Sequence, residues 1–340
     1  MPTVLLQEYG QLQSDIQSQE QAIQRWSQPI SQYLPDTALH NPIATMVKPG
    51  APAPQPPVLV SVIGDADVSR TTAAGFGGLP GFSSTSASGG GGLLFNPSGA
   101  LGLAPDQRFL FSAGVWANGT NGQSHAPGSF SDNSTTFGLS ALYSIGRSYA
   151  TGVFLYDLGH VSTDASGVVG SYGAHGAAGD LELGHVFTLW TPPGGPNAPV
   201  TNGFHTILLD LSAHVGDTDE RGGSFVDSTG TANGSSFAYA WRTGVDAKLG
   251  AWYPLNGVLL SPYVKGGFDY AFCTETGVNS ATPGAPPVFT AALDRTEARF
   301  EAGLEVLTKS RLTFNLDGYY LDGSTIKTVG GQFTMRVLFP

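Results

Sequence analysis

The chain has 340 residues, a formal net charge of −11, and 47 glycines, and only 12% of its residues are charged. This acidic balance disfavours a nucleic-acid-binding protein, because no basic patch is available to neutralise phosphates. The single cysteine, Cys273, excludes an internal disulfide, a cysteine-rich zinc site and an iron–sulfur cluster. The sequence also contains no run of 18 apolar residues that would predict a transmembrane helix, and residues 1–10 lack the features of a signal peptide.

Residues 1–35 are predicted to form an N-terminal α-helix. Apolar residues recur there at alternating spacings of four and three, interrupted only by Gln19: Leu5, Tyr9, Leu12, Ile16, Ile23, Trp26, Ile30 and Tyr33. This pattern is typical of a coiled coil, so self-association through residues 3–33 is one expectation. A single amphipathic helix that lies on another surface, or is threaded through a polar lumen, fits the same pattern.

The helix is followed by a different kind of sequence. Residues 36–56 are rich in proline and are predicted to form a stiff, extended linker. A short apolar segment comes next, and the Gly/Ser-rich residues 75–92 are expected to form a long loop. We assign residues 57–340 to a single β-barrel domain with clear strands from residue 107.

Strict alternation of apolar and polar residues dominates the chain after residue 106. Between Phe237 and Tyr253 the odd positions are mostly apolar, whereas the even positions include Arg242 and Asp246. Such a period of two predicts a strand with one apolar and one polar face. Ten strands of this kind are predicted, near 107–118, 135–145, 148–160, 178–190, 203–217, 236–253, 258–274, 289–307, 311–321 and 326–339.

The length of these strands favours a membrane barrel over a soluble sandwich. Strands in soluble sheets usually have 5–6 residues, whereas a tilted strand that crosses a bilayer needs about 9–11. The predicted connections alternate between tight turns, such as Gly146–Arg147, and long loops, here near 119–134, 161–177, 218–235 and 275–288. The predicted fold is therefore all-β: a closed antiparallel transmembrane β-barrel of 10–12 strands with an N-terminal α-helix. Twelve strands require that residues 58–63 and 93–103 pair.

Three C-terminal segments resemble the β-domain of autotransporters and related Gram-negative outer-membrane barrels. They are Arg299-Phe300-Glu301-Ala302-Gly303-Leu304-Glu305, Leu312-Thr313-Phe314-Asn315-Leu316-Asp317-Gly318-Tyr319-Tyr320 and Gly330-Gly331-Gln332-Phe333-Thr334-Met335-Arg336-Val337-Leu338-Phe339. The resemblance implies twelve strands, a helix through the lumen, and a location among the lipids of a bacterial outer membrane. It also implies that Phe333, Met335, Val337 and Phe339 form a signal read by the barrel-assembly machinery, although Pro340 departs from the pattern.

Charged residues on the polar face are the candidate functional residues. Those expected to face the lumen are Asp157, Asp180, Glu182, Asp210, Arg242, Asp246, Lys248, Lys265, Asp269, Arg299, Glu301, Glu305, Asp317 and Arg336. One interpretation is that they pair with one another and seal the lumen. The other is a narrow pore that prefers cations, since carboxylates outnumber the basic groups. Cys273 is expected on the same inward face.

No catalytic, cofactor or metal site is predicted. Asp210 and His214 share a face of one strand, but their spacing of four residues places them about 13 Å apart, too far for a hydrogen bond. The expected interfacial aromatic girdles consist of Trp116, Trp190, Trp241, Trp252, Tyr143, Tyr253 and Phe339. We expect a barrel with an anchoring, structural or passive transport role and no enzymatic chemistry. The alternatives are a porin-like channel for small solutes and a surface adhesin that acts through its long loops.

Overall fold

The computed structural model describes residues 59–75, 81–104, 106–125, 127–190, 206–255, 258–279, 288–289, 295–308 and 312–339. The helix predicted for residues 1–35 and the linker at 36–56 lie outside these residues. Every regular element in the described ranges is a β-strand. Within the same ranges, no helix has the length and hydropathy needed to cross a bilayer.

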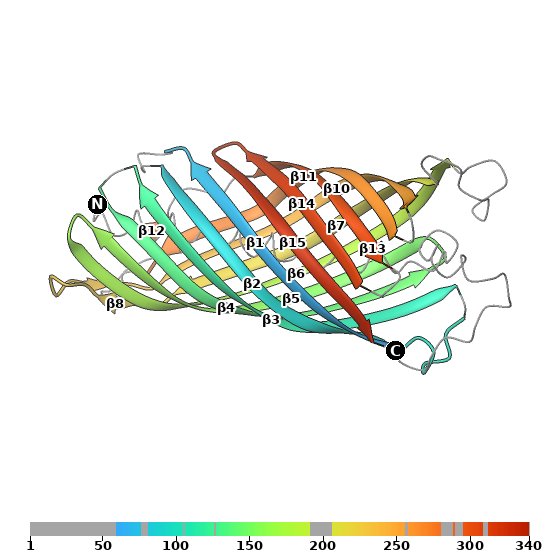
Figure 1. The fold of residues 1–340 in the computed structure, drawn as a ribbon. Coiled ribbons are helices and arrows are strands. Elements are labelled where there is room, and N and C mark those ends of the chain that lie inside the picture. Colours follow the sequence, from blue (N-terminus) through green and yellow to red (C-terminus); the bar gives the residue numbers. More distant parts are fainter. Residues whose placement is uncertain are drawn as a thin grey trace.

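Twelve long strands form one closed antiparallel barrel. Each strand pairs with its neighbour in chain order, and β15 pairs with β1 (Figure 1). The long strands are β1 (Leu59–Ala73), β2 (Phe82–Asn96), β3 (Gln107–Ser124), β4 (Ser129–Ile145), β5 (Ser148–Ala165), β6 (Val168–Trp190), β7 (Thr206–Gly222), β10 (Ser236–Leu255), β11 (Val258–Val278), β13 (Thr296–Thr308), β14 (Leu312–Gly323) and β15 (Ile326–Phe339). The short strands β8 (Phe225–Val226) and β9 (Ala232–Asn233) pair with each other, and β12 (Val288–Phe289) pairs with β11.

The pairing of the first two strands decides whether the barrel has ten or twelve strands. β1 and β2 pair along their whole length, and Val62 lies opposite Leu93. The loop predicted for residues 75–92 is therefore wrong, because β2 begins at Phe82. Its residues are mostly Ser, Thr, Ala and Gly over this stretch, so the alternation of apolar and polar residues disappears although the chain remains extended.

Two of the predicted long loops are also strand. β3 and β4 are joined by residues 125–128, and β5 and β6 by Ser166 and Gly167 alone. Ser166 and Gly167 have φ values of +57° and +89°, and positive φ at both central residues is what a tight type I′ hairpin requires. The residues near 119–134 and 161–177, which were expected to form loops, are thus mostly extended strand. They lie at the end of the barrel opposite the one where β1 begins and β15 ends.

The outer face of these strands divides into two zones. On β4, Phe137, Leu139, Tyr143 and Ile145 are between 39% and 48% exposed and cover about nine residues of strand, which matches the length needed to cross a bilayer. The outward positions that precede them, from Ser129 to Thr135, are polar. The strands therefore continue beyond the lipid zone with water-compatible side chains on the outside.

The aromatic girdle is only partly as expected. Tyr143, Trp190 and Trp241 are exposed, but Trp116 and Trp252 are each only 7% exposed. Both lie at inward positions, and the indole Nε1 of Trp116 donates a hydrogen bond to Asp65. These two tryptophans therefore belong to the interior and not to a membrane interface.

Cys273 lies on the outer face, contrary to expectation. Trp241 of β10 pairs with Cys273 of β11, but the next residue, Arg242, pairs with Ala271. Phe272 is left without a partner on β10, which is a β-bulge. The extra residue reverses the alternation, so Cys273 is exposed.

Candidate functional site

The structure places the predicted charged residues on the inward face of their strands. On β10, Asp246 is 8% exposed whereas its neighbour Val245 is 57% exposed, and on β13 Arg299 and Phe300 are 2% and 58% exposed. The same alternation holds along β6, β7, β11, β14 and β15. Because the sheet is closed, the buried face is the lumen wall, where these charges meet across strands.

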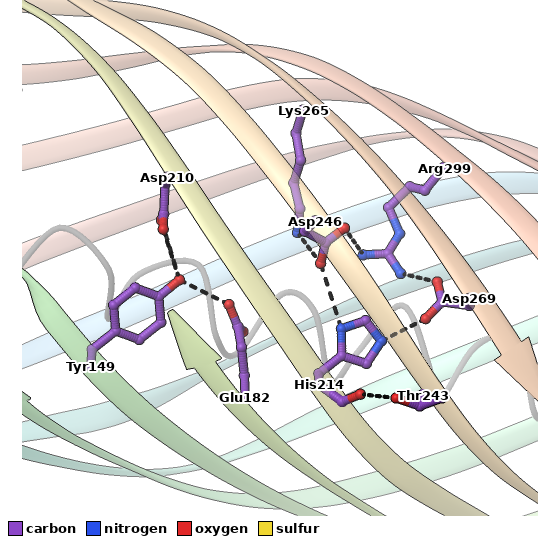
Figure 2. Close-up of polar contacts among 9 residues, drawn as sticks. All are labelled: Tyr149, Glu182, Asp210, His214, Thr243, Asp246, Lys265, Asp269 and Arg299. Atoms are coloured by element: carbon purple, nitrogen blue, oxygen red, sulfur yellow. Dashed lines mark hydrogen bonds and ion pairs between the residues drawn. The ribbon is translucent and has the colours of Figure 1, made fainter. Parts of the chain in front are cut away.

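The largest cluster joins four strands around Asp246 and Asp269 (Figure 2). Arg299 of β13 contacts Asp269 Oδ2 at 2.9 Å and Asp246 Oδ1 at 3.5 Å. Lys265 Nζ lies 3.4 Å from Asp246 Oδ2. His214 of β7 lies between the two carboxylates, with Nε2 2.5 Å from Asp269 Oδ1 and Nδ1 3.7 Å from Asp246 Oδ2. The cluster therefore links β7, β10, β11 and β13 through side chains alone.

His214 and Asp269 form a histidine–aspartate pair that was not predicted. Asp210, the residue considered as a partner in the sequence, instead accepts hydrogen bonds from the Tyr149 hydroxyl at 3.1 and 3.2 Å. A catalytic histidine needs a nucleophile or a substrate at its second nitrogen. Here the second nitrogen faces Asp246, so the geometry is that of an ion cluster.

A second cluster centres on Tyr149. Its hydroxyl donates to Glu182 Oε1 at 2.9 Å as well as to Asp210, so it lies between carboxylates from β6 and β7 (Figure 2). The ring of Tyr149 lies over Gly184, the residue directly opposite it on β6. A Cβ at Gly184 would lie within the van der Waals surface of that ring. Glycine at this position therefore allows the tyrosine to lie flat on the wall.

A third cluster repeats this arrangement between β10 and β14. Tyr263 donates to Glu301 at 2.7 Å, and its ring lies against Gly303 of β13. Lys248 Nζ lies 3.9 Å from the centre of the Tyr263 ring and 3.1 Å from Glu305 Oε1. Neither tyrosine was identified from the sequence. A tyrosine at an inward position of a predicted strand is the signal that could have found both, whereas the glycine opposite each depends on the strand register.

The remaining predicted charges lie on the same inward face. Asp317 accepts a hydrogen bond from Asn315 at 2.8 Å, and Asp157 accepts one from Thr136 at 2.5 Å. Asp180, Arg242 and Arg336 are half-buried at inward positions of β6, β10 and β15. Among the residues that the structure describes, no group of three or more His, Cys, Asp or Glu side chains could hold a metal ion.

The opposite part of the wall has pairs of hydroxyl groups across neighbouring strands, beside the buried carboxylates Asp67 and Asp132. Thr71 and Thr328 are 2.9 Å apart, Ser86 and Thr120 are 2.9 Å apart, and Ser112 and Ser140 are 2.6 Å apart. Each pair consists of directly opposed residues on neighbouring strands. These short side chains satisfy one another directly across the ladder.

An apolar ring lines the lumen at the end where β1 begins and β15 ends. Nine of its members are 9% exposed or less, and each comes from a different strand: Ile63, Leu94, Leu110, Leu142, Tyr149, Val186, Leu208, Trp252 and Leu259, with Leu307 packed against them. An apolar ring inside an outer-membrane barrel is unexpected, because the interior is normally polar.

The predicted assembly signal lies on the strand that closes the barrel. Phe333 and Met335 are 42% and 38% exposed on the outer face of β15, and Val337 on the same face is half-buried. Phe339 is the last residue of β15 and lies opposite Val60 of β1. The signal therefore occupies the seam between the last strand and the first.

Comparison with known proteins identifies the architecture. Residues 100–318 match the model of the autotransporter β-domain family, whereas no curated protein sequence matches the chain. The translocator domain of the autotransporter NalP from Neisseria meningitidis superposes with a TM-score of 0.65 at 11% identity, covering 99% of this chain and 99% of that one. The β-domain of the Bordetella autotransporter Brka gives 0.60 at 16% identity, covering 83% and 100%. The transport unit of AIDA-I from Escherichia coli gives 0.58 at 13% identity, covering 89% and 98%. At these identities the structural likeness shows the fold alone.

Proposed function

Because this chain belongs to the autotransporter β-domain family and is a Gram-negative outer-membrane β-barrel, we propose that the barrel anchors the chain in the membrane and that residues 3–33 fill its lumen. In this proposal the barrel holds its own N-terminal segment and does not work as an open channel. The function requires no enzymatic step, and the paired charges of the wall serve as binding and structural groups.

The apolar ring is the observation that carries this proposal. Water-filled lumens are lined by polar groups, so a ring contributed by ten strands calls for an apolar occupant. Residues 3–33 have a matching stripe, which includes Ile16, Ile23 and Trp26, and their other positions are rich in glutamine. The glutamines suit the hydroxyl and charged parts of the wall that lie beyond the ring.

The connection is long enough for this arrangement. Residues 36–58 separate the predicted helix from β1, whose first residue lies at the same end as the ring. An extended proline-rich chain rises about 3.1 Å per residue, so this linker reaches roughly 70 Å. It can leave β1, turn at the mouth and deliver the segment into the lumen.

Single-channel conductance in planar bilayers tests the proposal. We expect low conductance for the full chain and a severalfold rise after deletion of residues 1–56. The triple variant Ile16→Asp/Ile23→Asp/Trp26→Asp should behave like the deletion, because it removes the apolar stripe. Substituting serine for Gln13, Gln17 and Gln24, which lie off the stripe, is the matched control and should leave conductance low.

Other outcomes identify the alternatives. Equal and high conductance with and without residues 1–56 would contradict the plug and favour a porin-like channel. The acidic excess on the wall would then give preference to cations. Low conductance of both forms, together with chemical cross-linking of full-length chains through residues 3–33, would contradict the plug and favour self-association by a coiled coil.

A further inference from the structure

A polar hollow lies on the outside of the barrel, away from the lumen. It has a volume of about 600 Å³ and is formed by β1 to β6 near the end opposite the termini of the sheet. Its outward-facing lining includes Arg70, Thr85, Asn121, Gln123, Ser131 and Ser162. Asn121 and Ser131 lie an even number of residues from Val115 and Phe137 on the same strands, so they point to the same, lipid-facing side. The hollow is therefore on the outer face of the sheet.

The lining residues form two parallel rows across neighbouring strands. The register aligns Arg70 with Thr85, Thr85 with Asn121, Asn121 with Ser131, and Ser131 with Ser162. The second row, one step further from the membrane, runs through Ser83, Gln123, Ser129 and Asp164. Hydrogen-bonding side chains thus face outward side by side on strands about 4.8 Å apart.

The chemistry of the rows suits a neutral ligand with many hydroxyl groups. The side-chain amides of Asn121 and Gln123 have no hydrogen-bond partner among the described residues. Each amide offers donors and an acceptor, and the serine and threonine hydroxyls offer both. The lining has one cation, Arg70, and one anion, Asp164, which also accepts a hydrogen bond from Gly167 N at 2.7 Å. Such a balanced set favours a saccharide over a highly charged ligand.

The position of the hollow along the barrel axis, relative to the apolar zone, indicates that the saccharide is attached to a lipid. Asn121 lies six residues beyond Val115 on β3, which is roughly 20 Å along a tilted strand. Val115 and Phe137 belong to the apolar zone that contacts acyl chains. A lipid that packs against this zone would carry its headgroup to the level of the hollow, on the same side of the barrel.

We propose that this hollow binds the saccharide part of a glycolipid in the outer leaflet, while the acyl chains lie on the apolar zone below it. The site is independent of the lumen and does not rest on the proposed anchoring function. The bound lipid would cover the sector of the barrel in which β1 to β6 extend beyond the apolar zone with polar residues on their outer face.

The test uses the full chain refolded into phospholipid nanodiscs with and without lipopolysaccharide, and native mass spectrometry as the readout. We expect bound lipopolysaccharide, and also measurable binding of its oligosaccharide after removal of the acyl chains. The double variant Asn121→Ala/Gln123→Ala should weaken both by about tenfold, since it removes two hydrogen-bonding groups. Thr296→Ala/Lys327→Ala changes exposed residues at the same end on β13 and β15 and is the matched control.

Three outcomes would overturn the proposal. Lipopolysaccharide could bind without any effect of the double variant, which would show that only the acyl chains are recognised. The oligosaccharide could fail to bind at all. The two double variants could lower binding equally, which would show that the sector from β1 to β6 is not special. Heat-modifiable gel mobility confirms that each variant is folded, so a loss of binding by Asn121→Ala/Gln123→Ala cannot be attributed to a misfolded barrel.

Discussion

The two halves of the lumen wall satisfy their polar groups in different ways. Between β15 and β5, hydroxyl pairs such as Ser112 and Ser140 join residues that are directly opposed on adjacent strands. Between β5 and β14, ionic and tyrosine side chains reach past a strand: Arg299 of β13 contacts Asp246 of β10 across β11. The short contacts therefore reinforce the existing ladder, whereas the long contacts add links that the backbone does not make.

This difference determines how each half responds to the loss of one side chain. A buried serine that loses its partner leaves one neutral hydroxyl unsatisfied, which costs about 1 kcal/mol or more. A buried carboxylate that loses its cation remains as an uncompensated charge. The ionic half should therefore be the more sensitive to single substitutions, although it makes more contacts.

The largest effect is expected for Arg299→Met. This change leaves Asp246 and Asp269, which are 8% and 4% exposed, without their shared guanidinium. Removing one partner of a buried ion pair costs about 3–5 kcal/mol. We expect a loss of this size in the free energy of unfolding, measured by guanidinium titration of the refolded barrel in detergent.

The exposed pair Arg221–Asp219 provides the control. The two side chains are 61% and 40% exposed and lie 2.8 Å apart, so Arg221→Met should change stability by less than about 1 kcal/mol. A similar, small loss for both arginine variants would mean that the lumen is wet enough to screen the carboxylates. In that case the proposed contrast between the two halves of the wall would be wrong.

The sequence predicted the faces of the strands better than their ends. The alternation of apolar and polar residues arises where one face of a strand contacts lipid. It is therefore clear from Phe137 to Ile145, where one face is apolar. It was not recognised at Asn121, Ser131 and Ser162, where the outer face is polar although the chain is still extended. The turn at Ser166 and Gly167 is the local signal that could have corrected the loop prediction for residues 161–177.

Partners within the site could not be predicted, because they depend on the register of several strands. His214 meets Asp269 only because β10 lies between their strands and places Gly244 opposite both residues. A side chain at Gly244 would occupy the space in which the two meet. A single-residue slip in either pairing would move one of them to the outer face, as the bulge at Phe272 does for Cys273.

A smaller effect is expected for Gly184→Val, which acts on the aromatic component of the ionic half. The valine side chain would displace the Tyr149 ring from the wall and separate its hydroxyl from Glu182 and Asp210. Overpacking of this kind costs about 1–3 kcal/mol. We expect that loss in the same titration, and slower appearance of the folded band on gels during refolding into vesicles.

Gly152→Val on β5 is the control for this change. Gly152 lies at an outward position, and nothing lies within 4 Å of the place where its Cβ would be. We expect it to refold at the normal rate and with unchanged stability. Equal defects in the two glycine variants would attribute the effect to the loss of glycine itself and not to the displaced tyrosine.

The smallest effect is expected in the hydroxyl half, from Ser112→Ala, Ser140→Ala and the double variant. Each single change leaves one hydroxyl at a position that is 1–3% exposed, and an unsatisfied buried group of this kind costs about 1 kcal/mol or more. Removing both hydroxyls leaves no unsatisfied group, so the double variant should be close to the natural protein and more stable than either single one. A double-mutant cycle from the same guanidinium titrations measures this coupling. If the two losses were additive, the hydroxyls would act independently, and direct pairing across the ladder would not be what satisfies the hydroxyl groups of this half of the wall.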